Sequence, residues 1–222
     1  MLVAGLDEAG RGSVIGPMAV AGVLVDEGGL EALVEMGVRD SKVLRPRERE
    51  ELAEGIRCVV LAHRVILIPP CEIDRAVSRG ALNKLEARVM ADIICELGPD
   101  IAYVDASDVV EGRFARAVRS FLRPGVKTAV VAEHGADARY PVVAAASILA
   151  KVERDRAVRA LEEDLGVEIG SGYPTDPRTL RFLRNWYARH KRYPDFVRRS
   201  WRTAREIAAE VLGTRLDDWL YE

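Results

Sequence analysis

Two apolar segments joined by a glycine-rich loop occupy residues 2–26, with the sequence LVAGLDEAGRGSVIGPMAVAGVLVD. The first segment, residues 2–8, ends in the acids Asp7 and Glu8, and the second, residues 17–26, is rich in Val, Ala and Leu. Apolar runs of this length, bounded by glycine and proline, are typical of buried strands. The pattern therefore predicts two strands at the start of the chain, with a pair of acids where the first one ends.

Strand-like and helical patterns alternate after this pair. Further strands are predicted over residues 58–68, 101–105 and 126–132. Helical periodicity and the placement of Pro and Gly predict helices over residues 47–57, 72–78, 81–97, 111–121, 141–165, 177–189 and 198–212. This order favours an α/β domain with a mixed five-stranded sheet flanked by helices. We expect the domain to span residues 1–170, with a C-terminal helical extension over residues 171–222.

The composition indicates a folded protein with a sizeable core. Of the 222 residues, 49% are hydrophobic and 31% are charged, which is unlike a disordered chain. No apolar run approaches the roughly 18–20 residues that a membrane span needs, and no basic segment of a signal peptide opens the chain. Cys58, Cys71 and Cys95 lack C-x-x-C spacing and have apolar neighbours. We therefore expect reduced thiols in the core of a cytoplasmic protein.

Basic residues concentrate near the C-terminus. Residues 178–205 hold ten Lys or Arg and one acid, so this stretch carries a formal charge of +9 and the rest of the chain −11. A basic stretch on an otherwise acidic chain suggests a polyanionic partner, although such runs also occur as solvated helix faces. Aromatic residues lie among the basic ones, and we expect most of their rings to pack: Phe182, Trp186, Tyr187, Tyr193, Phe196 and Trp201.

The loop at residues 7–16, DEAGRGSVIG, has two interpretations. Its glycines come within one residue of a dinucleotide-binding fingerprint, but the loop leads into Pro17 and a strand, so no helix N-terminus is there to bind a pyrophosphate. Alternatively, Asp7 and Glu8 ligate metal while the glycines let backbone amides approach a sugar–phosphate. Because neighbours in a strand point to opposite faces, this second interpretation requires Glu8 to lie at the strand's end.

Further acids follow strands or precede helices. Asp105 ends the apolar segment 101–105, and Asp137 lies four residues before Pro141, where the long helix begins. Asp108 is better explained as the N-cap of the next helix. We expect four carboxylates from three chain segments to converge at one edge of the sheet: Asp7, Glu8, Asp105 and Asp137.

Four carboxylates in one pocket repel one another and raise at least one pKa unless cations neutralise them. Ligation by oxygen alone suits Mg²⁺ or Mn²⁺, whereas zinc normally recruits His or Cys. Two such ions, about 3.5–4 Å apart, can activate a water and stabilise the leaving oxygen of an in-line phosphoryl displacement. The histidines are scattered and receive no role: His63, His134 and His190.

Five motifs, in order, resemble ribonuclease HII, and the archaeal form most. They are D-E-A-G-R-G at residues 7–12, Asp40-Ser41-Lys42 followed by Leu44, the strand end at Asp105, residues 136–142 with 145–152 (ADARYPV and AASILAKV), and Gly172-Tyr173-Pro174-Thr175. The likeness runs from residue 4 to about residue 178, and the remaining residues match only as a basic helical tail.

The resemblance implies a ribonuclease H-like fold and a metal-dependent endonuclease. Such an enzyme hydrolyses the RNA strand of RNA–DNA hybrids and cuts 5′ of ribonucleotides at RNA–DNA junctions, leaving 3′-OH and 5′-phosphate ends. The resemblance further implies that Asp7, Glu8, Asp105 and Asp137 hold two Mg²⁺ or Mn²⁺ ions. The partner would be a hybrid, or a DNA duplex containing ribonucleotides, bound by a monomer away from any membrane.

The resemblance also implies substrate contacts. Gly10, Arg11 and Gly12 would read 2′-hydroxyls, which distinguish RNA from DNA, and Tyr173 would contact the deoxyribose after the last ribonucleotide. Three residues would contact phosphates: Lys42, Ser147 and Lys151. Plainer roles stay open, namely an ion pair for Arg11, solvent exposure for Ser147 and Lys151, and loop packing for Tyr173. Asn83 is a further candidate neighbour of the site.

Two other classes of protein fit parts of this pattern. A hybrid-binding protein without activity would keep the groove but would not need all four acids. A junction resolvase or a transposase-like nuclease of the same fold would share the acids without needing the G-R-G loop or Tyr173.

Overall fold

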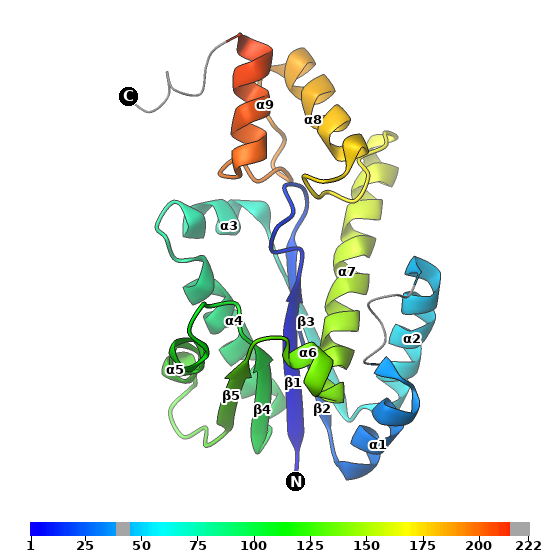
Figure 1. Cartoon of the computed structure of the whole chain (residues 1–222), viewed down its shortest axis with the longest axis vertical. Helices are drawn as coiled ribbons and strands as arrows, with labels where there is room; N and C mark the ends of the chain where they lie inside the picture. Colours follow the sequence, from blue (N-terminus) through cyan, green and yellow to red (C-terminus); the bar gives the residue numbers. More distant parts are fainter. Residues whose placement is uncertain (39–44, 214–222) are drawn as a thin grey trace. The chain divides into compact units, whose positions relative to one another are not determined.

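The computed structural model describes residues 1–38 and 45–213, which divide into two compact units. The first unit comprises residues 1–9, 19–67 and 82–153, and the second comprises residues 10–18, 68–81 and the chain from Arg154 on. Lys42 lies outside the described residues, so its predicted phosphate contact stays a prediction. Figure 1 shows the elements of both units.

A mixed five-stranded sheet of order β3-β2-β1-β4-β5 forms the first unit. The strands are β1 (Val3–Ala9), β2 (Met18–Val25), β3 (Ala62–Ile68), β4 (Ile101–Asp105) and β5 (Ala129–Glu133). β1 pairs antiparallel with β2 and parallel with β4, which in turn pairs parallel with β5. The predicted mixed sheet is therefore confirmed, with the acid-bearing strand β1 at its centre.

Helices cover both faces of this sheet. They are α1 (Glu27–Glu35), α2 (Pro46–Val59), α4 (Leu82–Leu97), α5 (Glu111–Phe121), α6 (Ala136–Arg139) and the first part of α7 (Pro141–Leu165). In Figure 1, α4 and α5 lie on one side of the sheet, and α1, α2 and α7 lie on the other. The small residues that open α7 let it approach the sheet closely, and Ala144, Ala145 and Ala146 are all buried.

Glycine at position 5 permits this close approach. A Cβ atom at Gly5 would lie 2.3 Å from the backbone carbonyl carbon of Val142, so the start of α7 crosses β1 with its backbone in contact. On the opposite face, a Cβ atom at Gly22 would lie 2.4 Å from Cγ2 of Ile93 in α4. Because side chains two residues apart on a strand share a face, Asp7 points to the side where α7 lies.

The second unit is built from α3 (Pro70–Val77), the end of α7, α8 (Pro177–His190) and α9 (Arg202–Leu212). Val14 and Ile15 of the glycine-rich loop enter its core, and Ile15 forms an isolated β-bridge with Val197. The aromatic residues of the basic stretch line this core as expected: Phe182, Trp186, Tyr187, Tyr193, Phe196 and Trp201. The predicted C-terminal helices are thus confirmed, whereas the compact unit that contains them begins at Arg154 and also includes residues 10–18 and 68–81.

Some elements differ from the sequence-based prediction. α1 was not predicted, because Gly28 and Gly29 disfavour a helix, yet the side chain of Asp26 caps it by accepting the Gly29 N–H at 2.9 Å. The short helix α6 was not predicted either. The strand predicted from Cys58 begins at Ala62, because α2 continues through Val59.

The predicted burial of the cysteines is wrong. Cys58 and Cys71 are exposed, Cys95 is half-buried, and all three thiols are free. Cys58 and Cys71 lie on the outer sides of α2 and α3, whose buried sides are formed by other residues. Apolar neighbours in sequence therefore do not imply burial on a helix, where adjacent residues point in different directions. Within the described ranges, no helix is long and apolar enough to cross a membrane.

Candidate active site

Parallel pairing of β1 with β4 brings Asp7 and Asp105 together. Leu6 is in register with Val104, so the residues that follow them lie side by side at the same edge of the sheet. The Asp7 side chain is buried, at 6% exposure. Asp105 is close enough for its negative charge to act on the Asp7 carboxyl. These two acids, far apart in sequence, form the centre of the candidate site.

Burial raises the pKa of Asp7 from its ordinary 3.8 to about 7, and the charge of Asp105 adds to the rise. Three groups oppose it by stabilising the carboxylate: the Ser147 hydroxyl, the backbone N–H of Glu8 at 2.7 Å, and the charge of Lys151. A cation bound by the pair would favour the ionised form of both acids. The carboxylate pair is therefore chemically suited to a hard divalent ion.

Ser147 and Lys151 reach the pair from α7. Lys151 Nζ donates a hydrogen bond to Ser147 Oγ at 2.8 Å, and the Ser147 hydroxyl in turn hydrogen-bonds to Asp7. Ser147 is buried, at 2% exposure, so the interpretation in which it faces solvent is wrong. Both residues act here through their contacts with Asp7, and their predicted phosphate contacts stay predictions.

The helix α6 lies beside Asp105. The Oδ1 atom of Asp105 accepts the backbone N–H of Ala136 at 2.7 Å, directly after the left-handed turn at Gly135. Asp137 is the next residue, in the first turn of α6, and is half-buried. α6 therefore places Asp137 directly after Ala136, whose backbone N–H donates to Asp105.

Glu8 does not lie where the metal interpretation required it. β1 continues through Ala9, and Glu8 stays in register with Val20, so the strand has not ended at Glu8. The pleat therefore directs the Glu8 side chain to the opposite face from Asp7. In the part of the chain that the structure describes, no three His, Cys, Asp or Glu side chains are grouped closely enough to hold one ion. The structure brings Asp7 and Asp105 together and places Asp137 beside the residue that Asp105 contacts, and the role of Glu8 as a ligand stays a prediction.

Asp108 organises the start of α5. Its Oδ1 accepts the N–H of Val110 at 3.0 Å, and its carboxylate pairs with Arg113, which holds the pKa of Asp108 below its usual range. Val110, not Asp108, is the N-cap, so the predicted cap is displaced by two residues. Nδ2 of Asn83 donates to Oδ2 of Asp108 at 3.2 Å, so Asn83 contacts the carboxylate that precedes α5.

The glycine-rich loop in the second unit contains glycines of two kinds. Gly10 has φ +81°, and a Cβ atom there would lie 3.0 Å from the carbonyl oxygen of Pro17, so the fold requires glycine. Gly12 has no such φ, and a Cβ atom there would meet no described atom within 4 Å. Gly12 is also exposed, so its surface is open to a ligand.

Tyr173 lies next to this loop. The carbonyl oxygen of Gly172 accepts the N–H groups of Val14 at 2.8 Å and Ile15 at 3.1 Å. The Arg154 guanidinium stacks 4.5 Å from the centroid of the Tyr173 ring. The second unit thus joins two predicted substrate-binding elements, the loop and Tyr173.

Sequence reasoning missed the importance of two buried arginines. Arg154 and Arg198 are 2% and 0% exposed, and both contact the glycine-rich loop. Arg198 was counted within the basic stretch, where a charge pattern predicts surface exposure. No local signal distinguishes it from its exposed neighbour Arg199.

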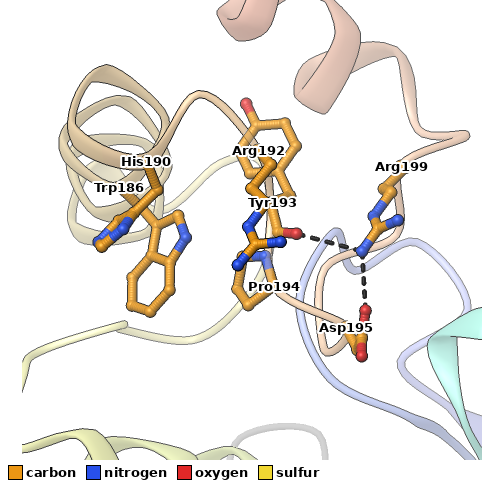
Figure 2. A pocket seen from close by; sticks show the side chains of 7 residues that line it. All are labelled: Trp186, His190, Arg192, Tyr193, Pro194, Asp195 and Arg199. Carbon is orange, nitrogen blue, oxygen red and sulfur yellow. Dashed lines mark hydrogen bonds and ion pairs between the residues drawn. The ribbon is translucent and has the colours of Figure 1, made fainter.

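A pocket of about 530 Å³ in the second unit is lined by part of the basic stretch. Figure 2 shows its lining, with the Trp186 and His190 rings close together and Arg199 paired with Asp195. The lining residues are Trp186, His190, Arg192, Tyr193, Pro194, Asp195 and Arg199. Exposed cations beside aromatic rings make this surface a candidate for contacts with a nucleic-acid backbone.

Comparisons with known proteins agree with the resemblance seen in the sequence. The family model described as Ribonuclease HII matches residues 4–204. The ribonuclease HII of Thermococcus kodakarensis is 49% identical over 95% of this chain and 91% of its own length. The crystal structure of ribonuclease H2 from Pyrococcus horikoshii has a TM-score of 0.88 and 42% identity, covering 96% of this chain and 99% of that one.

The ribonuclease HII chain in the structure of the PCNA:RNase HII complex from Archaeoglobus fulgidus has a TM-score of 0.83. It is 44% identical and covers 91% of this chain and 96% of that one. The expected ribonuclease H-like fold and enzyme class are thereby confirmed. The chain belongs to the ribonuclease HII family, the metal-dependent endoribonucleases that act on RNA–DNA hybrids.

Proposed function

We propose that this enzyme cuts 5′ of a ribonucleotide at an RNA–DNA junction, as well as within longer hybrids, and leaves 3′-OH and 5′-phosphate ends. The observation that supports this proposal most is the Asp7–Asp105 pair, in which Asp7 is buried and its pKa is raised to about 7. A paired, desolvated carboxylate of this kind is characteristic of functional sites. When a water attacks the phosphorus and the bond to the 3′-oxygen breaks, the 3′-oxygen leaves as a 3′-OH and the phosphate stays on the 5′ end.

Two Mg²⁺ or Mn²⁺ ions are the proposed cofactors, and Asp7, Asp105 and Asp137 are their proposed ligands together with Glu8. When bound, such ions activate a water and stabilise the leaving oxygen. Glu8 follows Asp7 directly on β1, and its backbone N–H donates to Asp7 Oδ1 at 2.7 Å, so the two acids come from the same end of the strand. The donor set consists of oxygen atoms alone, which suits these hard ions.

The residues around the acids have defined tasks in this proposal. Ser147 donates to the Asp7 carboxylate and orients it, while the charge of Lys151 favours its ionised form. The N–H of Ala136 fixes one oxygen of Asp105. We assign Lys151, with Ser147 and Lys42, to the phosphates of the substrate, where cations position the strand without reading its sequence.

Recognition of RNA is assigned to the second unit. We propose that Gly10, Arg11 and Gly12 contact the 2′-hydroxyl beside the scissile phosphate, which the open surface at Gly12 supports. Tyr173 is assigned to the deoxyribose that follows. In the sequence only Ala9 separates Glu8 from Gly10, so the loop proposed to contact the ribose follows the acids Asp7 and Glu8 almost directly.

Residues 171–222 are proposed as a substrate-binding region of a monomeric, cytoplasmic enzyme. Its basic side chains would contact duplex phosphates on either side of the cut. We also propose that the chain binds PCNA, because a relative 44% identical over 91% of this chain was solved in a PCNA complex. Co-elution with PCNA on size-exclusion chromatography tests this partner, and separate elution at micromolar concentration contradicts it.

A cleavage map tests the function. A DNA duplex with one ribonucleotide and an RNA–DNA hybrid of the same sequence are each incubated with Mg²⁺ or Mn²⁺. The products are sized against markers with defined ends, and Asp105→Asn serves as the inactive control. A single cut 5′ of the ribonucleotide is expected. Cutting 3′ of it, or products with 2′,3′-cyclic phosphates, would contradict the proposed chemistry.

A further inference from the structure

The glycine-rich loop directs several backbone carbonyl groups toward two side chains that precede or open α9. Arg198 donates from Nη1 to the carbonyl oxygen of Arg11 at 3.0 Å and from Nε to that of Gly16 at 3.1 Å. Trp201 donates from Nε1 to the carbonyl oxygen of Gly12 at 3.3 Å. All of these residues belong to the second unit.

Arg198 is fixed by burial, by a contact with the Trp201 ring and by a backbone hydrogen bond. Its side chain is fully buried, and its guanidinium lies 4.9 Å from the centroid of the Trp201 ring. Its backbone N–H donates to the carbonyl oxygen of Val14 at 2.9 Å. Moving a guanidinium out of water costs free energy unless its N–H groups are hydrogen-bonded. Hydrogen bonds from a charged donor are stronger than those between neutral groups. The burial of Arg198 is therefore coupled to the conformation of the loop.

The contact with Arg11 determines which way one peptide group faces. The carbonyl of Arg11 and the N–H of Gly12 belong to the same peptide group, and all peptide bonds in the described chain are trans. In a planar trans peptide the two groups point in opposite directions. With the carbonyl turned to Arg198, the N–H of Gly12 points away from it.

Gly12 is also the place where the loop is most open. Among the described residues its N–H has no hydrogen-bond partner, and a Cβ atom there would touch nothing within 4 Å. Ser13, Val14, Ile15 and Gly16, by contrast, all donate their N–H groups to carbonyl oxygens of the second unit. From Ser13 to Gly16 the loop is thus fixed by its own backbone hydrogen bonds, while the Gly12 N–H remains available to a ligand in the described structure.

We propose that Arg198 and Trp201 are positioning residues that set the preference for ribose over deoxyribose, by holding the Arg11–Gly12 and Gly12–Ser13 peptide groups so that the Gly12 N–H faces the 2′-hydroxyl. The inference rests on the proposed assignment of this loop to the ribose. It adds the two residues that fix the donor's direction without touching the substrate. Loss of either support lets the peptide groups rotate and weakens the contact that distinguishes RNA from DNA.

The test compares two constants for each variant. One is KM for a DNA duplex with one ribonucleotide, and the other is Ki for the all-DNA duplex of the same sequence as a competitive inhibitor. Their ratio, Ki over KM, reports recognition of the ribose. A variant that merely folds less well lowers the concentration of active enzyme and leaves this ratio unchanged.

Two substitutions remove the supports in different ways. Trp201→Phe keeps a ring beside Arg198 but removes the indole N–H, and Arg198→Lys keeps the charge but not the forked pair of donors. We expect the ratio to fall roughly three- to tenfold in each, the range of one lost hydrogen bond, mainly through a higher KM. The matched control is Trp186→Phe, whose ring packs against Phe182 instead of the loop. It should move KM and Ki together and leave the ratio unchanged.

An unchanged ratio in folded Arg198→Lys would overturn the inference. If that variant does not fold, Trp201→Phe decides, since it removes one hydrogen-bond donor and leaves Arg198 in place. A ratio within twofold of wild type in Trp201→Phe would then overturn it. Failure of the proposed function looks different, because the wild-type enzyme itself would bind both duplexes equally or leave the ribonucleotide uncut.

Discussion

Lys151 Nζ lies 2.8 Å from Ser147 Oγ, one turn earlier on α7, and Ser147 continues the contact to Asp7 on β1. A cation on the helix is thereby linked through one hydroxyl to the most buried acid of the candidate site. The link partly offsets the burial that raises the pKa of Asp7 to about 7. Stability, metal binding and catalysis should therefore all respond to changes at these residues.

The first prediction concerns the stability of the metal-free protein. The pKa of Asp7 is higher in the fold than its ordinary 3.8, so the folded state binds a proton more tightly than the unfolded chain. Stability then falls as the pH rises from about 4 to about 7, by roughly 2–4 kcal/mol, and stays reduced above that range. Asp7→Asn removes this loss, so its Tm in chelator should exceed that of wild type at pH 8 but not at pH 4.

Thermal melts at both pH values measure this difference, with Asp92→Asn on the exposed side of α4 as control. Several millimolar Mg²⁺ should raise the Tm of wild type more than that of Asp7→Asn, since binding to the folded state stabilises it by mass action. Equal pH dependence of wild type and Asp7→Asn in chelator would show that Asp7 does not titrate near neutrality.

The second prediction concerns turnover. Asp105→Asn should lower kcat about a thousandfold or more while KM changes only a few-fold, because substrate affinity rests on groups elsewhere. Steady-state kinetics with saturating Mg²⁺ give both constants. A variant that retains a tenth of wild-type kcat would remove Asp105 from the metal site.

The third prediction separates the two glycines of the loop. Gly12→Ala should leave the Tm within about 1 °C of wild type, because the new Cβ atom meets nothing in the described structure. It should raise KM for a one-ribonucleotide duplex about tenfold by obstructing the sugar. Gly10→Ala should instead destabilise the fold by roughly 1–3 kcal/mol, because φ +81° is unfavourable for alanine. Normal kinetics in Gly12→Ala would contradict a close approach of the substrate at this residue.

The fourth prediction concerns the tyrosine beside the loop. Tyr173→Ala should slow cutting at a lone ribonucleotide more than cutting within a long RNA tract, where several riboses share the recognition. Tyr173→Phe keeps the ring that stacks with Arg154 and should behave like wild type on both substrates. Equal losses on the two substrates in Tyr173→Ala would indicate that the tyrosine only packs the loop.

The fifth prediction concerns the salt dependence of binding. Arg192→Gln, in the pocket of Figure 2, should reduce the slope of log K against log salt by about one, as expected for one lost phosphate contact. Arg64→Gln, an exposed arginine of the first unit, is the control and should leave the slope unchanged. Deleting the helical region is a poorer test, because Phe182, Leu183 and Val197 form the core of the second unit. An unaltered slope in Arg192→Gln would dismiss this residue from the interface.

Much of the fold could be predicted because its signals are local. Ile101–Asp105 and Glu111–Phe121 form the strand and helix that their sequences predict, and α7 spans the predicted residues 141–165. Periodicity, proline at helix starts and glycine at turns act over a few residues, so they can be recognised without knowledge of the partners. The positions of Asp7 and Asp105 near strand ends were predicted on the same local basis, whereas the family was identified by its resemblance in five ordered motifs between residues 4 and 178.

The sequence by itself determined which residue types stand at the ends of β1 and β4, and hence the class of chemistry. Only the tertiary structure decided that β1 and β4 are neighbours, that Ser147 faces Asp7, and that β1 continues past Glu8 to Ala9. It also decided that Arg198 is buried against the carbonyl of Arg11, 187 residues away in sequence, although its charge suggested the surface. The physical reason is that burial, pKa and long-range hydrogen bonds depend on which segments pack together, and no short stretch of sequence contains both partners.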